Sequence, residues 1–99
     1  MAIVSAENYL TSLRALRPEL AARFKVKEIG LFGSVVRGEQ SQGSDLDVLV
    51  EFDAGADLFD LCGLAAFLEQ QFERKVDVVP RRALRAELRS AILHELVAA

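Results

Sequence analysis

The architecture of this chain follows from two neighbouring stretches, Gly33-Ser34-Val35-Val36-Arg37-Gly38-Glu39 and Ser44-Asp45-Leu46-Asp47-Val48. An apolar run, Ile29-Gly30-Leu31-Phe32, leads into the first stretch and is typical of a strand. Because Gly33 has no side chain, backbone N–H groups at this turn can approach an anion closely. The two stretches therefore predict a strand, an anion-binding turn and a second strand that begins with acidic residues.

Asp45 and Asp47 are the acidic residues of the second strand. Side chains two residues apart on a strand point to the same face, about 7 Å apart along it. Both carboxylates can therefore converge on one or two hard cations. Mg²⁺ usually takes one or two protein carboxylates, keeps several waters and completes its shell with phosphate oxygens. An aspartate pair beside an anion-binding turn thus predicts a site for a nucleoside triphosphate bound with Mg²⁺.

Asp77 is a candidate for a third carboxylate at this site. It interrupts the apolar run Val76-Asp77-Val78-Val79, which predicts a further strand. A buried and unpaired aspartate in such a run would be costly, and a metal ion would serve as its partner. Sequence alone does not place this strand beside the one that carries Asp45 and Asp47.

Each of these features has a plainer interpretation when it is taken alone. A Gly-Ser pair is a common turn, and an Asp-x-Asp pair is more often a solvated strand edge than a metal site. Here the turn follows one strand, the aspartate pair opens the next, and the third aspartate lies in another strand. Because the separate features agree on one structural context, their combination favours the nucleotide site.

The combination resembles the signature of the nucleotidyltransferase superfamily, which joins a Gly-Ser turn, an Asp-x-Asp strand and an aspartate on a neighbouring strand. The longer pattern, Gly33-Ser34-x-x-Arg37-Gly38-Glu39 with Ser44-Asp45-x-Asp47, resembles the minimal nucleotidyltransferase antitoxins that pair with HEPN ribonuclease toxins. This resemblance covers nearly the whole chain. Val36 departs from the family pattern, which often has a small residue such as alanine at that position.

The resemblance implies an enzyme that transfers AMP from ATP to a hydroxyl of the partner toxin, commonly a tyrosine, and that can form a hetero-oligomer with this toxin. It also implies a small palm-like domain in which Asp45, Asp47 and Asp77 meet at one end of the sheet. There they would hold two Mg²⁺ ions, one at the triphosphate and one that activates the acceptor hydroxyl for in-line attack. Asp77 could instead act as the base, and the sequence does not decide between these roles.

The other candidate residues would bind the phosphates. Ser34 would donate its hydroxyl and backbone N–H, Gly33 would permit the close approach, and Arg37 could bind phosphate oxygens bidentately. The alternative for Arg37 is a structural ion pair with Glu39 or another nearby carboxylate. Ser44 could bind phosphate or simply shape its loop.

A function from a different class is also compatible with the sequence: a binding-only antitoxin that masks the toxin and uses the fold as a scaffold. The complete set of three aspartates favours the enzyme. Nucleotide transfer to a small molecule is disfavoured, because a chain of 99 residues leaves no room for a second lobe.

Length and composition predict one compact domain over residues 1–99, with 52% hydrophobic residues. No apolar run approaches the roughly 18 residues of a membrane helix, and the N-terminus does not resemble a signal peptide, so we expect a cytoplasmic protein that does not bind membranes. Cys62 is the single cysteine, which rules out an intrachain disulfide. The net charge of −3 argues against general nucleic-acid binding.

Apolar spacing predicts the elements before and around the turn. A helix is expected from about residue 6 to 17, with Ser5 as a possible cap and Pro18 as its end. A strand over 26–32 and a short helix over 34–37 should follow. In the strand that begins near Asp45, one face should be apolar and the other should carry the aspartates.

The second half of the chain predicts helix, strand and helix. The first helix, capped by Asp57, should bury a stripe of Leu58, Leu61, Cys62, Ala65, Leu68 and Phe72. A strand over 75–79 should end at Pro80, and a last helix should bury Leu84, Leu88, Ile92 and Leu96. Two strands joined through a long helix predict a mixed α/β fold, with helices packed on a small mixed sheet.

Overall fold

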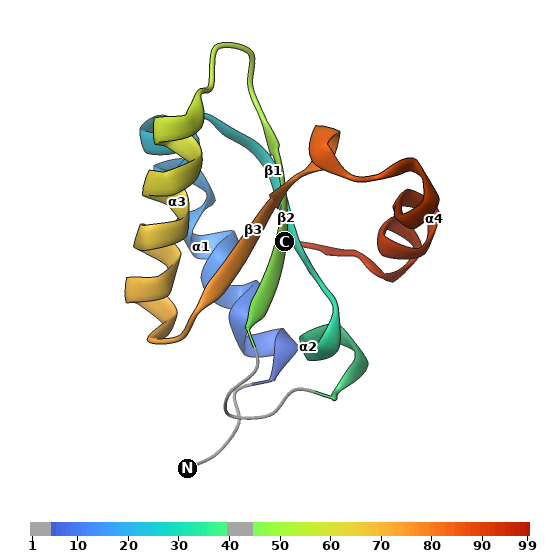
Figure 1. The fold of residues 1–99 in the computed structure, drawn as a ribbon. Helices are drawn as coiled ribbons and strands as arrows, with labels where there is room; N and C mark the ends of the chain where they lie inside the picture. Colours follow the sequence, from blue (N-terminus) through green and yellow to red (C-terminus); the bar gives the residue numbers. More distant parts are fainter. Residues whose placement is uncertain (1–4, 40–44) are drawn as a thin grey trace.

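The computed structural model describes residues 5–39 and 45–99 (Figure 1). In chain order these residues form α1 (Ala6–Phe24), β1 (Val26–Phe32), α2 (Ser34–Arg37), β2 (Leu46–Phe52), α3 (Leu58–Phe72), β3 (Val76–Pro80), the 3₁₀ helix η1 (Arg81–Ala83), α4 (Ala86–Glu95) and β4 (Val97–Ala98). The strands make one sheet in the order β3-β2-β1-β4. α1 and α3 cover one face of this sheet, and α4 lies on the opposite side (Figure 1).

The sheet is mixed, as the sequence predicts. β1 pairs antiparallel with β2 and β4, whereas β2 and β3 run parallel. α3 provides the long crossover that two parallel neighbours require. The expected strand over 26–32 and helix over 34–37 are confirmed as β1 and α2, and none of the helices in the described residues is long and apolar enough to span a membrane.

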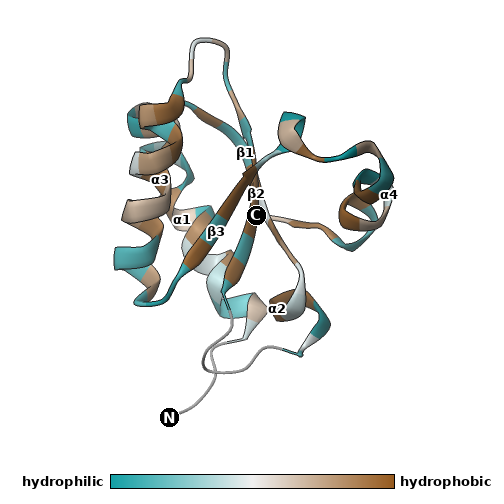
Figure 2. Ribbon diagram, viewed as in Figure 1, coloured by the Kyte–Doolittle hydropathy of each residue, from teal (hydrophilic) through white to brown (hydrophobic). Residues whose placement is uncertain are grey.

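The core lies between the sheet and the pair α1 and α3. β2 and β3 are mostly hydrophobic along their length (Figure 2). The largest fully buried side chains of the core come from α1, β1, β2 and α3: Leu13, Leu20, Leu31, Leu46, Val48, Val50, Leu64 and Leu68. The alternation of Leu46, Val48 and Val50 along β2 turns the intervening residues to the opposite face of the sheet. The predicted division of this strand into a core face and a site face is confirmed.

The prediction that Pro18 ends the first helix is wrong, because α1 continues to Phe24. A proline inside a helix costs roughly 3 kcal/mol through a lost hydrogen bond and steric crowding. The turns after Pro18 bury Leu20 and Phe24, and burying each such side chain stabilises the fold by about 1.5–3 kcal/mol. The gain from two buried side chains offsets the cost of the proline.

The predicted apolar stripe of α3 is wrong at its start. Asp57 caps the helix through a capping box shared with Asp60, but Leu58 is 70% exposed and Cys62 is exposed. Gly63 lies against the ring of Phe24, where a Cβ atom would come within 2.9 Å of a ring carbon. This close contact between α3 and α1 turns the helix so that Leu64 and Leu68 point inward and Cys62 points outward.

The C-terminal segment differs most from its prediction. α4 is shorter than expected and has no buried residue, and Leu88 is 49% exposed. The chain then forms β4, a strand of two residues that pairs with Gly30 and Leu31 of β1. Periodicity did not indicate this strand, because two residues are too few to show any period.

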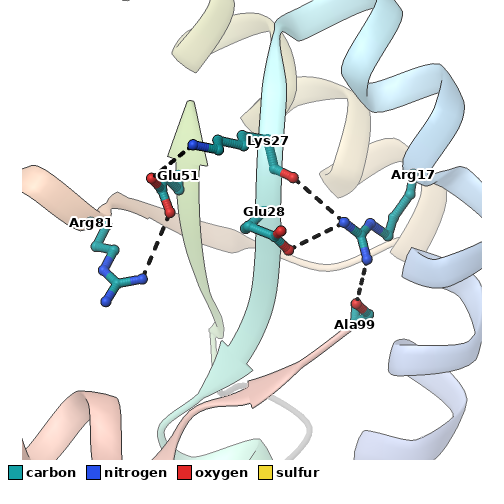
Figure 3. Close-up of polar contacts among 6 residues, drawn as sticks. All are labelled: Arg17, Lys27, Glu28, Glu51, Arg81 and Ala99. Atoms are coloured by element: carbon teal, nitrogen blue, oxygen red, sulfur yellow. Dashed lines mark hydrogen bonds and ion pairs between the residues drawn. The ribbon is translucent and has the colours of Figure 1, made fainter. Parts of the chain in front are cut away.

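A polar network ties this C-terminal segment to α1 and β1 (Figure 3). The guanidinium of Arg17 donates to the carbonyl oxygen of Ala99 at 3.0 Å and to the Glu28 carboxylate at 3.2 Å. On the neighbouring strand, Glu51 pairs with Lys27 at 3.8 Å and with Arg81 at 3.7 Å. Such exposed ion pairs contribute up to about 1 kcal/mol each, so the apolar core, not this network, dominates stability.

The orientation of α3 can be tested by truncating one side chain on each face. Leu64→Ala should lower the free energy of unfolding by about 2–5 kcal/mol, because Leu64 is fully buried. Leu58→Ala, the matched control on the same helix, should change it by no more than about 0.5 kcal/mol. Urea unfolding of both variants measures the two effects, and equal losses would contradict the described face of α3.

Candidate functional site

The candidate site lies at one end of the sheet, where three segments distant in sequence come together. Phe32, the last residue of β1, pairs with Asp47 on β2, and Asp47 pairs with Asp77 on β3. Paired residues on neighbouring strands are about 4.8 Å apart and present their side chains on the same face. The register therefore places Asp77 beside Asp47, with the Gly33 turn at the other flank of Asp47.

Gly33 is required at the turn for two separate reasons. Its backbone has φ 81° and ψ −152°, a conformation that residues with a side chain rarely adopt. A Cβ atom on Gly33 would also collide with the carboxylate of Asp47. The turn thus packs its bare backbone directly against the central aspartate of the site.

The carboxylates of the site repel one another. The pKa of Asp47 is raised, first by partial burial and then by the negative charges of Asp77 and Asp45. The positive charge of Arg37 opposes this rise, and Glu95 adds to it. Asp47 is half-buried, whereas Asp45 and Asp77 are exposed, so the expectation that Asp77 is buried is wrong. Asp77 lies on the open face of the sheet and not inside the apolar core.

This donor set fits Mg²⁺. Its ligands are hard carboxylate oxygens, two of them in direct register, and a divalent cation would relieve the repulsion that raises the pKa of Asp47. Within residues 5–39 and 45–99, no three His, Cys, Asp or Glu side chains already stand close enough together to hold a metal ion. Asp47 and Asp77 would suffice, because Mg²⁺ usually takes only one or two protein carboxylates.

Of the two serines predicted to bind phosphate, the structure describes only Ser34. Ser34 is the first residue of α2 and is half-buried, and its carbonyl oxygen accepts the backbone N–H groups of Gly38 and Glu39. These bonds fix the short helix directly after the turn. Ser44 lies outside the described residues.

Arg37 makes the ion pair that the sequence offers as the alternative to phosphate binding. Its Nε donates to Glu39 at 3.0 Å, and its Nη1 donates to Glu95 at 2.9 Å. The hydrogen bond that Arg37 donates to Glu95 is the first cause of its raised pKa, followed by the one that it donates to Glu39. Arg37 is therefore held at the site by carboxylates of the protein itself, and its binding to phosphate stays a prediction.

Glu95 is the site residue that the sequence analysis missed. One carboxylate oxygen accepts the backbone N–H of Gly33 at 2.5 Å, while the other accepts from Arg37. The Arg37 hydrogen bond, followed by the Gly33 N–H, lowers the pKa of Glu95. Glu95 belongs to no motif and lies 62 residues from Gly33, so only the packing of α4 beside the turn reveals it.

Comparison with known proteins agrees with this geometry. The nucleotidyltransferase domain model matches residues 13–99. The chain is 38% identical over 97 residues to the protein adenylyltransferase MntA of Thermococcus cleftensis, a match that covers 98% of each chain. It is similar to the solved structure of a minimal nucleotidyltransferase, with a TM-score of 0.81, 35% identity and 98% of each chain covered. A toxin–antitoxin complex solved with AMP-PNP matches with a TM-score of 0.69 and 26% identity, over 85% of this chain and 69% of that one.

The chain belongs to the nucleotidyltransferase domain family and is a nucleotidyltransferase. Its similarity to the minimal nucleotidyltransferases, expected from the Gly33-Ser34 turn and the Asp45/Asp47 pair, is confirmed, and so is the predicted fold class. The roles of the individual site residues stay predictions.

Substitution of Gly33 tests the contact between the turn and Asp47. Gly33→Ala should destabilise the protein by about 1–3 kcal/mol and weaken binding of ATP with Mg²⁺ at least about tenfold, since the new methyl group displaces the Asp47 carboxylate. Gly38→Ala is the matched control, because Gly38 also has a positive φ, 73°, but open space around its Cβ position. Urea unfolding and calorimetric titration with ATP measure both effects, and equal behaviour of the two variants would refute the contact.

Because negative charges surround Asp47, replacing its carboxylate with a neutral amide should stabilise the protein, and the size of this gain should depend on pH. A carboxyl group whose pKa is raised by folding binds protons more tightly in the folded state, so it destabilises that state once the pH exceeds its unfolded pKa. Asp47→Asn should therefore raise the urea midpoint at pH 7 without metal, and the gain should vanish below pH ~4, where Asp47 is protonated in both states.

Asp53→Asn, in the exposed turn after β2, is the control for the loss of one negative charge. Millimolar Mg²⁺ should stabilise the wild type and the Asp53→Asn variant but not Asp47→Asn, since a ligand that binds only the folded state raises its stability. A midpoint for Asp47→Asn below that of the wild type at pH 7 would contradict the proposed repulsion.

Proposed function

We propose that this protein is a cytoplasmic antitoxin that transfers AMP from ATP to a tyrosine hydroxyl of a partner HEPN ribonuclease toxin, with Mg²⁺ bound at the aspartates. The observation that carries the proposal is the register that sets Asp47 opposite Asp77 and against the backbone of Gly33. This arrangement brings metal-binding carboxylates and an anion-binding turn to one point, as transfer of a nucleotide from a triphosphate requires.

The relatives support a protein as the acceptor of the nucleotide and a toxin as the partner. The Thermococcus cleftensis relative is a protein adenylyltransferase, which acts on a protein and not on a small molecule. The toxin–antitoxin complex with AMP-PNP shows that a protein of this fold can assemble with a toxin.

In the proposed reaction, Asp45, Asp47 and Asp77 would hold Mg²⁺, which neutralises phosphate charge and makes the acceptor hydroxyl more acidic. The backbone N–H of Gly33 and the guanidinium of Arg37 would donate hydrogen bonds to phosphate oxygens. The tyrosine oxygen forms a bond to the α-phosphorus, the bond to the bridging oxygen breaks, and pyrophosphate leaves. Asp77, exposed beside Asp47, is a metal ligand or takes the hydroxyl proton.

The alternative is a binding-only antitoxin that neutralises the toxin through complex formation. The charges of Asp45 and Asp77 near Asp47 favour the enzyme, since mutually repelling carboxylates bring no benefit to a scaffold. Direct binding to nucleic acid is not part of either proposal, because the site is acidic and the net charge is −3.

Intact-mass spectrometry of the partner tests the proposed transfer. We expect the toxin encoded beside this protein to gain one or more AMP units when it is incubated with the protein, ATP and Mg²⁺. The double variant Asp45→Asn/Asp47→Asn should lose at least about 100-fold in rate, because the groups that would hold the metal are neutral. Asp53→Asn should retain activity. A stable complex without any mass shift would favour the binding-only antitoxin.

A further inference from the structure

The carboxylate of Glu95 lies where the donors of the phosphate-binding turn converge. It accepts the N–H of Gly33 at 2.5 Å and the Nη1 of Arg37 at 2.9 Å. A backbone N–H and a guanidinium are the two donor types that the proposed reaction assigns to phosphate oxygens. Glu95 reaches them from the last residue of α4, with 24% of its side chain exposed.

We propose that Glu95 is an internal phosphate mimic that occupies the triphosphate cradle of the free protein and must leave it when ATP binds. The proposal rests on the proposed function, because it takes the nucleoside triphosphate as the ligand of this turn. It assigns to α4 a role that no motif of the chain indicates: α4 carries the group that competes with the substrate.

Glu95 and a phosphate group cannot occupy the cradle together. The single hydrogen of the Gly33 N–H points to the Glu95 carboxylate, so a phosphate oxygen at the same place would replace that carboxylate. Two negative charges this close together also repel each other, and the repulsion is stronger near a protein surface than in bulk water. Binding of a triphosphate therefore requires Glu95 to turn away or α4 to shift.

The side chain of Glu95 is negatively charged at neutral pH. Its pKa is lowered by the hydrogen bond from Arg37 and next by the one from Gly33, so the group is a carboxylate at neutral pH. It also adds to the negative potential at Asp47, whose pKa it helps to raise. Its departure from the cradle would free the Nη1 group of Arg37, while Nε still donates to Glu39, and would remove one negative charge from beside the aspartates.

The packing of α4 allows this departure at small cost. None of the residues of α4, Ala86–Glu95, is buried, so little apolar surface holds the helix in place. The following residues are anchored instead: Leu96 packs on Gly30, and β4 pairs with β1. Glu95 thus stands at the junction between a loosely packed helix and a paired strand, where it could leave the turn without any loss of buried core.

Calorimetric titration with AMP-PNP and Mg²⁺ tests the proposal without any transfer reaction. Glu95→Gln and Glu95→Ala should bind the nucleotide about 5-fold or more tightly than the wild type, in the range of coupling energies between competing groups. Glu87→Gln is the matched control, since Glu87 is an exposed residue in the first turn of the same helix. It should bind within about twofold of the wild type.

The opposite role for Glu95 predicts the opposite result. If Glu95 shapes the turn for ATP or helps to hold Mg²⁺, both Glu95 variants should bind the nucleotide more weakly, and that outcome would overturn the proposal, as would unchanged affinity. The thermal melting curve of each variant shows whether it is folded. In nuclear magnetic resonance spectra, the Gly33 amide signal of Glu95→Ala should shift before any nucleotide is added, because its hydrogen-bond acceptor is gone.

The outcomes separate this proposal from the proposed function. Tighter nucleotide binding by the Glu95 variants without AMP transfer to the toxin would support the competition and refute the transfer. Transfer by the wild type with equal nucleotide affinity in all variants would support the function and refute the competition. No nucleotide binding by the wild type and both Glu95 variants alike would refute both.

Discussion

The contact between the backbone of Gly33 and the carboxylate of Asp47 is the constraint on which the site depends. It exists because β1 and β2 pair with Phe32 opposite Asp47, so that the chain leaves β1 at the point where β2 presents its central aspartate. Asp77 then joins from β3 through the parallel register. A shift of either register by one residue would turn these aspartates to the apolar core and remove the site.

The same contact explains the electrostatics of the site. Asp47 is pressed against a backbone turn, partly shielded from water, and faced by two further aspartates, which together raise its pKa. Arg37 compensates only part of this charge, because Glu39 and Glu95 already accept its hydrogen bonds. In the proposed reaction, a divalent cation would relieve the repulsion between the aspartates, and a bound polyphosphate would take the place of Glu95.

The sequence predicts well those features that depend only on residues close together in the chain. The Gly33-Ser34 turn, the Asp45/Asp47 pair and the strand alternation are local patterns, and the structure places them as expected. The position of Asp77 needs the β2/β3 register, the continuation of α1 past Pro18 needs the burial of Leu20 and Phe24, and the face of α3 needs the Gly63–Phe24 contact. No local pattern could indicate Glu95, because its contact with Gly33 joins residues that are 62 positions apart in the sequence.

The apolar core lies on one face of the sheet, and the candidate site lies at its end and toward the other face. α1 and α3 cover one face and bury the apolar core there, while α4, none of whose residues is buried, lies on the other side of the sheet (Figure 1). Asp47 and Asp77 stand in register on β2 and β3. Because the core does not rely on α4, that helix can move without unfolding the domain. Under the proposed competition, the fold would combine a turn held in place by the sheet with a loosely packed helix whose last residue, Glu95, leaves the turn when a nucleotide binds.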